Sequence, residues 1–75
     1  MMVQCLGWYP GMQKVNVTKL IQENTELTLG KAMEATKNIL ECETVAFYFV
    51  DEERGKRFEE KMIELGVHVR RKETK

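Results

Sequence analysis

The chain contains 75 residues, of which 43% are hydrophobic and 32% charged, and its 12 Lys and Arg residues balance 12 Asp and Glu residues. This length fits a single domain over residues 1–75, and the zero net charge argues against a dedicated nucleic-acid binder. Because no apolar run is long enough to span a membrane and the first residues lack a secretion signal, we expect a globular domain of the cytoplasm.

The first quarter of the chain predicts a strand, a turn and a helix. Residues 3–6 (Val-Gln-Cys-Leu) are typical of a short strand, and Pro10 with Gly11 has the chemistry of a turn. From Lys14 onward the spacing of apolar residues becomes helical. Residues 24–26 interrupt this spacing, so we expect the helix to end there.

A second helix is predicted to begin at Thr28, whose hydroxyl suits the N-cap position. The apolar residues that follow recur with the period of an α-helix. We expect six side chains to face the core, those of Leu29, Ala32, Met33, Thr36, Ile39 and Leu40.

The second half of the chain predicts a strand, a helix and a final strand. Residues 44–50 are uncharged and rich in β-branched and aromatic side chains, which is typical of a strand. Asp51 suits the N-cap of a third helix, which ends at Gly66. Residues 67–70 alternate apolar and polar side chains, as a strand does. We therefore expect an α+β fold of order βααβαβ, with a three-stranded antiparallel sheet and three helices on one face.

Several segments, taken in this order, resemble the C-terminal domain of the bacterial ribosomal stalk protein (protein seven/twelve of the large subunit). Residues 14–21 are similar to the family's lysine-valine start and the helix that follows it. Residues 27–32 fall where the family has a glycine-leucine-glycine-leucine-lysine-glutamate-alanine segment, and residues 50–71 resemble its last helix and strand. The similarity covers nearly the whole chain, apart from a short insertion before residue 46.

The resemblance implies a function in protein binding, because the family contacts translational GTPases through a basic face on its first two helices. Lys14, Val15 and Lys19 stand at matching positions. Gln22 stands where the family has an arginine and Met33 where it has a lysine, and these departures weaken the attraction for an acidic partner. The family's dimerisation segment and Ala-rich hinge have no counterpart here, so we expect a stand-alone copy of the domain.

A second family with this fold is the adaptor that delivers N-degron substrates to the Clp protease. Its pocket needs an asparagine-aspartate-aspartate loop after the first strand and a histidine on the second helix. Here residues 7–11 form that loop with other side chains, and the single histidine is His68. The pocket residues of that adaptor are therefore missing, although the fold is similar. The alternative function that we consider is an adaptor or accessory protein, for example of a mobile element, that binds a protein unrelated to ribosomes.

Two further features leave alternatives open. Trp8 and Tyr9 follow the first strand and either pack against the first helix or form a contact surface for a partner, since aromatic residues are enriched in binding hot spots. The uncharged strand over residues 44–50 is either covered on both sides or pairs with a second copy in a homodimer.

Nothing in the sequence favours an enzyme, a metal site or a cofactor. The chain contains no serine and one histidine, and Cys5, Cys42 and His68 cannot supply four zinc ligands, so we expect two half-buried thiols. The basic residues Arg70, Arg71, Lys72 and Lys75 have the composition of a solvated tail.

The predicted function is a non-enzymatic interaction module whose partner is a protein. Its candidate binding residues are Lys14, Val15, Thr18, Lys19, Gln22 and Lys31, with Trp8 and Tyr9.

Overall fold

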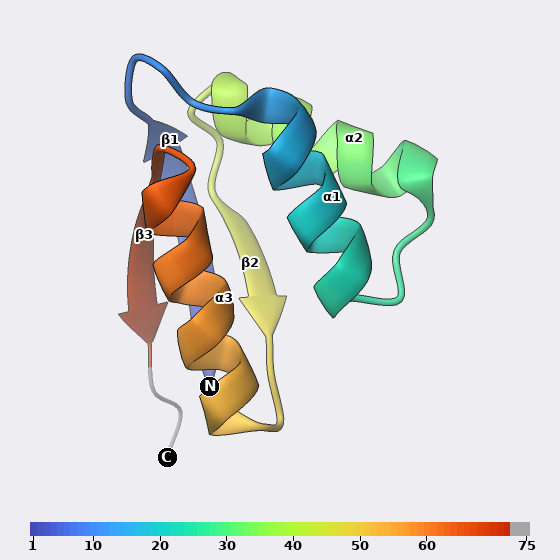
Figure 1. Cartoon of the computed structure of the whole chain (residues 1–75), viewed down its shortest axis with the longest axis vertical. Helices are drawn as coiled ribbons and strands as arrows, with labels where there is room; N and C mark the ends of the chain where they lie inside the picture. Colours follow the sequence, from blue (N-terminus) through green and yellow to red (C-terminus); the bar gives the residue numbers. More distant parts are fainter. Residues whose placement is uncertain (73–75) are drawn as a thin grey trace.

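The computed structural model describes residues 1–72, which form three helices and a three-stranded sheet (Figure 1). The elements in chain order are β1 (Met2–Trp8), α1 (Lys14–Asn24), α2 (Leu29–Leu40), β2 (Val45–Tyr48), α3 (Glu52–Glu64) and β3 (Val67–Lys72). The sheet order is β2-β1-β3, and both pairings are antiparallel. The predicted α+β class and the order βααβαβ are therefore confirmed.

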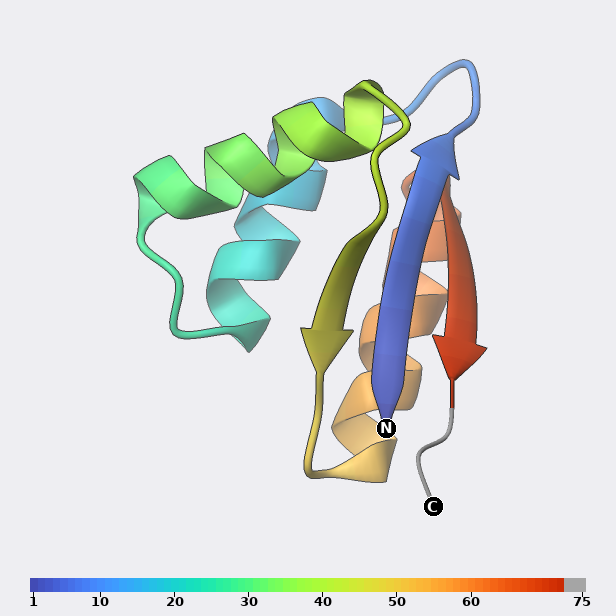
Figure 2. The same ribbon diagram turned by 180° about the vertical axis from the view of Figure 1, so that it is seen from behind.

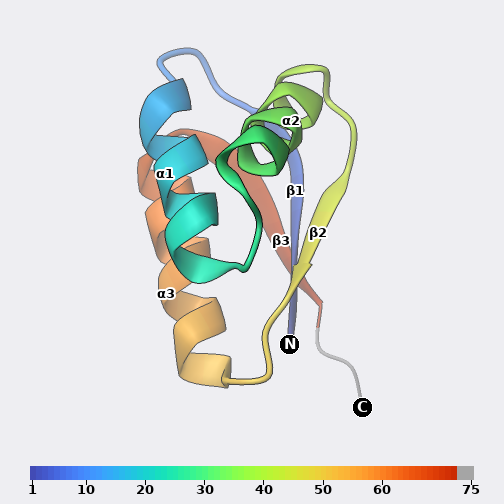
Figure 3. The same ribbon diagram turned by 90° about the vertical axis from the view of Figure 1, so that its right-hand side faces the viewer.

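The sheet has one face covered by helices and one open face, and successive residues of the central strand β1 point to them in turn. Val3 pairs with Phe47 and Arg71, and Cys5 pairs with Val45 and Val69. Directly paired residues of antiparallel strands point to the same side of a sheet, so these side chains share the face on which the helices pack. Figure 3 shows α1 and α3 on that side and α2 at the end of the sheet, and Figure 2, seen from behind, shows the strands with no helix in front of them.

The core lies between the covered face of the sheet and the helices. Its largest fully buried side chains include Phe58 and Met62 of α3, Ile21 of α1 and Ile39 of α2. Phe58 packs against Phe47 and Phe49, with ring centroids 5.2 Å and 5.0 Å away. The core is small, as the length of the chain predicts.

Local signals in the sequence place the helix boundaries. The side chain of Thr28 accepts a hydrogen bond from the backbone N–H of Lys31, and Asp51 accepts one from Glu53 at 3.0 Å. These bonds satisfy N–H groups that have no partner inside the first helical turn. Gly66 follows α3 with a φ of 93°, a value that glycine adopts without strain. The predicted caps at Thr28, Asp51 and Gly66 are confirmed.

The prediction that Leu29 and Met33 face the core is wrong, because their side chains are 53% and 58% exposed. The prediction is confirmed for Ala32, Thr36 and Ile39, which form the buried stripe of α2 together with Ala35. Three of these four residues are small, which lets α2 approach its neighbours closely. The larger side chains of Leu29 and Met33 remain at the edge of the contact.

All three strands differ from the predicted bounds. β1 extends to Trp8 rather than ending at residue 6, and β3 includes the basic residues that the sequence predicted as a solvated tail. Arg71 lies on the covered face of the sheet, and its guanidinium forms a 2.7 Å ion pair with Glu59 of α3. Lys75 lies outside the described residues. β2 is shorter than predicted and forms one edge of the sheet, with Phe47 and Phe49 buried and Tyr48 exposed.

Candidate protein-binding groove

A groove of about 590 Å³ runs between α1 and α2, and we call it the α1/α2 groove. Its lining comes from both helices and includes Lys14, Val15, Thr18 and Lys19 of α1 and Leu29, Met33, Glu34, Thr36, Lys37 and Leu40 of α2. The small buried side chains of α2 allow this helix to pack close to α1. The longer side chains of both helices then form the walls of the groove. The result is a concave surface built from two packed helices.

Apolar side chains line the α1/α2 groove and remain accessible. Val15 is 67% exposed, and Leu29 and Met33 are more than half exposed. Three large apolar side chains that come from two elements and share one concavity form a patch of the kind that marks interaction sites. A single exposed leucine is common on protein surfaces, whereas a groove lined by several exposed apolar side chains indicates a binding surface.

The base of the groove is held by two hydroxyl groups. Thr18 of α1 and Thr36 of α2 are buried, and their Oγ1 atoms lie 2.7 Å apart. The hydroxyl of Thr18 also reaches the carbonyl of Lys14, and that of Thr36 reaches the carbonyl of Ala32. These contacts satisfy both buried hydroxyls and fix the spacing of the helices.

The rim of the groove is more basic than acidic. Lys14 and Lys19 stand on α1, and Lys37 stands on α2. Glu34 is the acidic residue of the lining, and Lys37 makes a 4.0 Å contact with Glu41 one turn further along α2. An exposed pair of this kind contributes little to stability. The rim therefore favours a partner with acidic side chains beside its apolar ones.

The structure brings together four of the residues that the sequence predicted as binding residues. Lys14, Val15, Thr18 and Lys19 all line the groove. Gln22 and Lys31 are exposed on the same two helices and do not appear in that lining. Sequence reasoning missed Leu29 as a groove residue because its apolar side chain predicted burial.

The aromatic residues Trp8 and Tyr9 are not part of the lining of the α1/α2 groove. The indole N–H of Trp8 donates a 3.0 Å hydrogen bond to the carbonyl of Leu40, so this residue ties the end of β1 to the end of α2. The prediction offered α1 as its partner, whereas the observed hydrogen bond goes to α2. Trp8 and Tyr9 are 42% and 52% exposed, and Tyr9 contacts the ring of His68.

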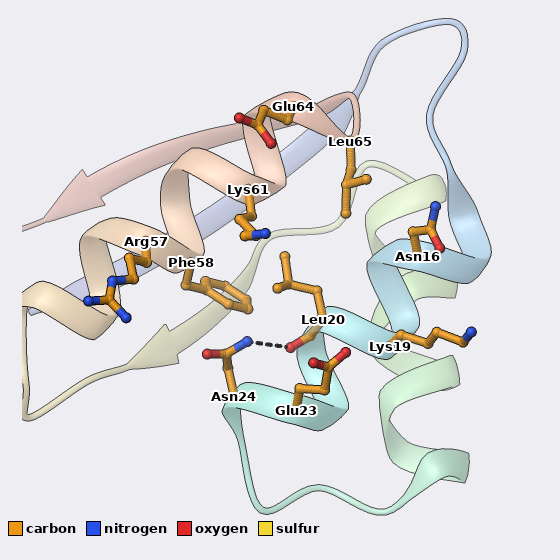
Figure 4. A pocket seen from close by; sticks show the side chains of 10 residues that line it. All are labelled: Asn16, Lys19, Leu20, Glu23, Asn24, Arg57, Phe58, Lys61, Glu64 and Leu65. Carbon is orange, nitrogen blue, oxygen red and sulfur yellow. Dashed lines mark hydrogen bonds between the residues drawn. The ribbon is translucent and has the colours of Figure 1, made fainter.

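A smaller and more polar hollow of about 360 Å³ lies between α1 and α3 (Figure 4). Leu20 and Phe58 point toward each other in its centre. Its rim mixes basic and acidic side chains, namely Lys19, Arg57 and Lys61 with Glu23 and Glu64. Because cations and carboxylates are mixed around it, this hollow offers a ligand neither a uniform charge nor a continuous apolar surface.

The two thiols differ from each other, although the sequence predicted two half-buried groups. Cys5 is fully buried in the sheet, and burial raises the pKa of its thiol from 9.0 to about 12. Cys42 is exposed in the loop after α2.

Among the described residues no group of three side chains is arranged to hold a metal ion. No helix in residues 1–72 is long and apolar enough to cross a membrane.

Comparisons with protein-family models, with curated proteins and with solved structures found no match for this chain.

Proposed function

We propose that this protein is a non-enzymatic interaction module whose α1/α2 groove binds an amphipathic helix of a protein partner. The observation that carries the proposal is the exposed apolar lining of the groove, formed by Val15, Leu29 and Met33. Helices that bind in a groove place apolar anchors along one face, and such a groove suits that mode. The Lys14 and Lys19 ammonium groups favour acidic side chains flanking those anchors.

The resemblance to the ribosomal stalk C-terminal domain supports translational GTPases as the partner class. In that family the first two helices make the contact, and here Lys14, Val15 and Lys19 stand at matching positions within the groove lining. This assignment rests on the resemblance and on the groove together. It predicts that this chain competes with the stalk for its GTPase.

The second candidate function is that of an adaptor or accessory protein that binds a partner outside translation. Met33 favours this function, because an exposed methionine stands where the stalk family has a lysine. Methionine adapts to many apolar shapes and is frequent at versatile binding surfaces. Such a partner would rely more on apolar anchors and less on charge.

A titration with a purified translational GTPase from the same host tests the first function. We expect the amide NMR signals of Val15, Leu29 and Met33 to shift as the GTPase is added. Lys14→Glu/Lys19→Glu should weaken binding by about tenfold or more, because the two substitutions reverse the charge of the rim.

The charge-matched control is Arg70→Glu/Lys72→Glu, which makes the same change in charge on another side of the molecule. This variant should bind the GTPase as the wild type does. Equal weakening by both variants, or shifts confined to residues outside the groove, would show that the groove is not the binding site. A GTPase that causes no shift at all, while Leu29→Asp abolishes binding of a different protein, would favour the accessory function.

A further inference from the structure

The open face of the sheet carries a second set of exposed side chains, separate from the α1/α2 groove. Met2 lies between Tyr48 and Lys72 in one row across the strands, and Gln4 lies between Ala46 and Arg70 in the next. Since Val3 and Cys5 face the helices, these rows face the other side. Figure 2 shows this side of the sheet with no helix in front of it.

Among residues 1–72, the strands place basic side chains and no carboxylate on the open face. His68, Arg70 and Lys72 alternate along β3 with side chains that face the helices, so all three lie on the open face and all are exposed. None of the residues in the two rows is acidic. The balanced total charge of the chain therefore conceals an uneven distribution, because the acidic residues within residues 1–72 lie on the helices and loops.

Aromatic rings flank the basic residues on the open face. Tyr48 stands on β2 and is 64% exposed. At the other end of the sheet the rings of Tyr9 and His68 lie 5.7 Å apart between centroids and are tilted by 36°. Neither tyrosine is needed to fill the core, because the buried cluster is complete without them. Exposed aromatic rings beside cations are the elements of a stacking platform for bases.

We propose that the open face binds single-stranded nucleic acid. The cations of Arg70 and Lys72 contact phosphates along β3, where alternate residues on one face are about 7 Å apart. Bases then extend across β1 toward Tyr48 and stack on its ring, while a second base stacks on Tyr9. The amide of Gln4 lies between these positions and offers a donor and an acceptor to a base edge.

Single-stranded nucleic acid fits this surface better than the other anionic partners. An acidic peptide would use the cations but has no flat ring to place on Tyr48 and Tyr9. A duplex offers phosphates, but its bases are already stacked and cannot reach the tyrosines. The sequence-based expectation against nucleic acid rested on net charge, and net charge does not report how the charges are distributed over the two faces of the sheet.

The proposal is tested by fluorescence anisotropy with a labelled single-stranded RNA of mixed sequence, about ten nucleotides long. Two phosphate contacts predict that log Kd rises with log salt concentration at a slope of about 1.4. Arg70→Glu/Lys72→Glu should weaken binding by at least tenfold and flatten this slope. Tyr48→Ala should weaken binding by at least fivefold, whereas Tyr48→Phe keeps the ring and should bind as the wild type does.

The controls separate this face from the α1/α2 groove and from general charge effects. Lys14→Glu/Lys19→Glu makes the same change in charge and should leave RNA binding unchanged. Equal loss in this variant would overturn the proposal, and so would tighter binding to a duplex of the same length. Displacement of the RNA by a short polyglutamate peptide at the same concentration would also overturn it, because the face would then recognise acidity rather than bases.

Discussion

The hydroxyl groups of Thr18 and Thr36 lie 2.7 Å apart and join α1 to α2 beneath the groove. Each hydroxyl has a second acceptor within reach, the carbonyl of the residue four positions earlier. The two hydroxyl groups can donate only two hydrogen bonds among these three contacts. Either one hydroxyl donates to the other across the helices, or both donate to the carbonyls of their own helices. The pair is a polar bridge in an otherwise apolar contact.

Replacing the two threonines singly and together should show that they act as a unit. Thr18→Val and Thr36→Val should each lower the free energy of unfolding by about 0.5–1.5 kcal/mol, because each removes one hydrogen bond. Thr18→Val/Thr36→Val should cost less than the sum of the single variants, since it leaves two apolar side chains of similar shape in contact. Urea unfolding of the four proteins measures this coupling. Strict additivity would mean that the bridge contributes nothing across the helices.

Gly66→Ala should destabilise the fold because the position allows no side chain. Gly66 has a φ of 93°, and an added Cβ would lie 2.9 Å from the Cα of Met12, a backbone atom that cannot move aside cheaply. We expect a loss of about 1–3 kcal/mol in the free energy of unfolding, measured by urea denaturation.

The matched substitution is Gly30→Ala, which adds the same methyl group to a helical position with open space around it. This variant should be neutral or more stable by up to about 1 kcal/mol, because alanine has the higher helix propensity. A loss of stability at Gly30 equal to that at Gly66 would contradict the explanation from backbone conformation.

The buried thiol of Cys5 should make stability depend on pH in the alkaline range. Its pKa rises from 9.0 to about 12 on folding. The unfolded chain therefore loses this proton first, and the free energy of unfolding should fall as the pH rises from 9.0 toward 12. The slope contributed by this thiol is about 1.4 kcal/mol per pH unit. Urea unfolding of the wild type and of Cys5→Ala at several pH values measures it, since the variant lacks only this thiol.

Two substitutions in α1 and α2 distinguish the proposed partner classes. Gln22→Arg and Met33→Lys introduce the basic residues that the ribosomal stalk family has at the positions that Gln22 and Met33 resemble. If the partner is a translational GTPase, the double variant should bind it several-fold more tightly, because the added charges strengthen the attraction to an acidic surface. If the groove instead binds a mainly apolar partner, Met33→Lys alone should weaken that binding. Isothermal titration with each purified partner decides between these outcomes.

The helix boundaries could be predicted from the sequence because they depend on neighbouring residues. A cap such as Thr28 or Asp51 bonds to N–H groups two or three positions ahead, and Gly66 is needed by the backbone at its own position. Such signals are local, and they remain valid whatever the rest of the chain does.

The lining of the candidate site depends on tertiary packing, and the sequence predicted only part of it. Hydrophobicity predicted that Leu29 and Met33 were buried, but Ala32 and Ala35 pack closer and leave both at the surface. The alternation along β3 already places Arg70 and Arg71 on opposite faces of the sheet. The sequence does not show that α3 packs over the face of Arg71 and brings Glu59 within 2.7 Å of it, because that contact joins two separate elements.

The position of β1 has a consequence for how the chain reaches its native state. The first strand is central, and both of its neighbours come from the second half of the chain. During synthesis β1 is made first and has no strand to pair with until residues 45–72 emerge. α1 and α2 can pack against each other earlier, because their contacts are local. We expect the helical pair to form while the nascent chain still lacks its sheet, and the late arrival of β3 to complete the fold in one cooperative step.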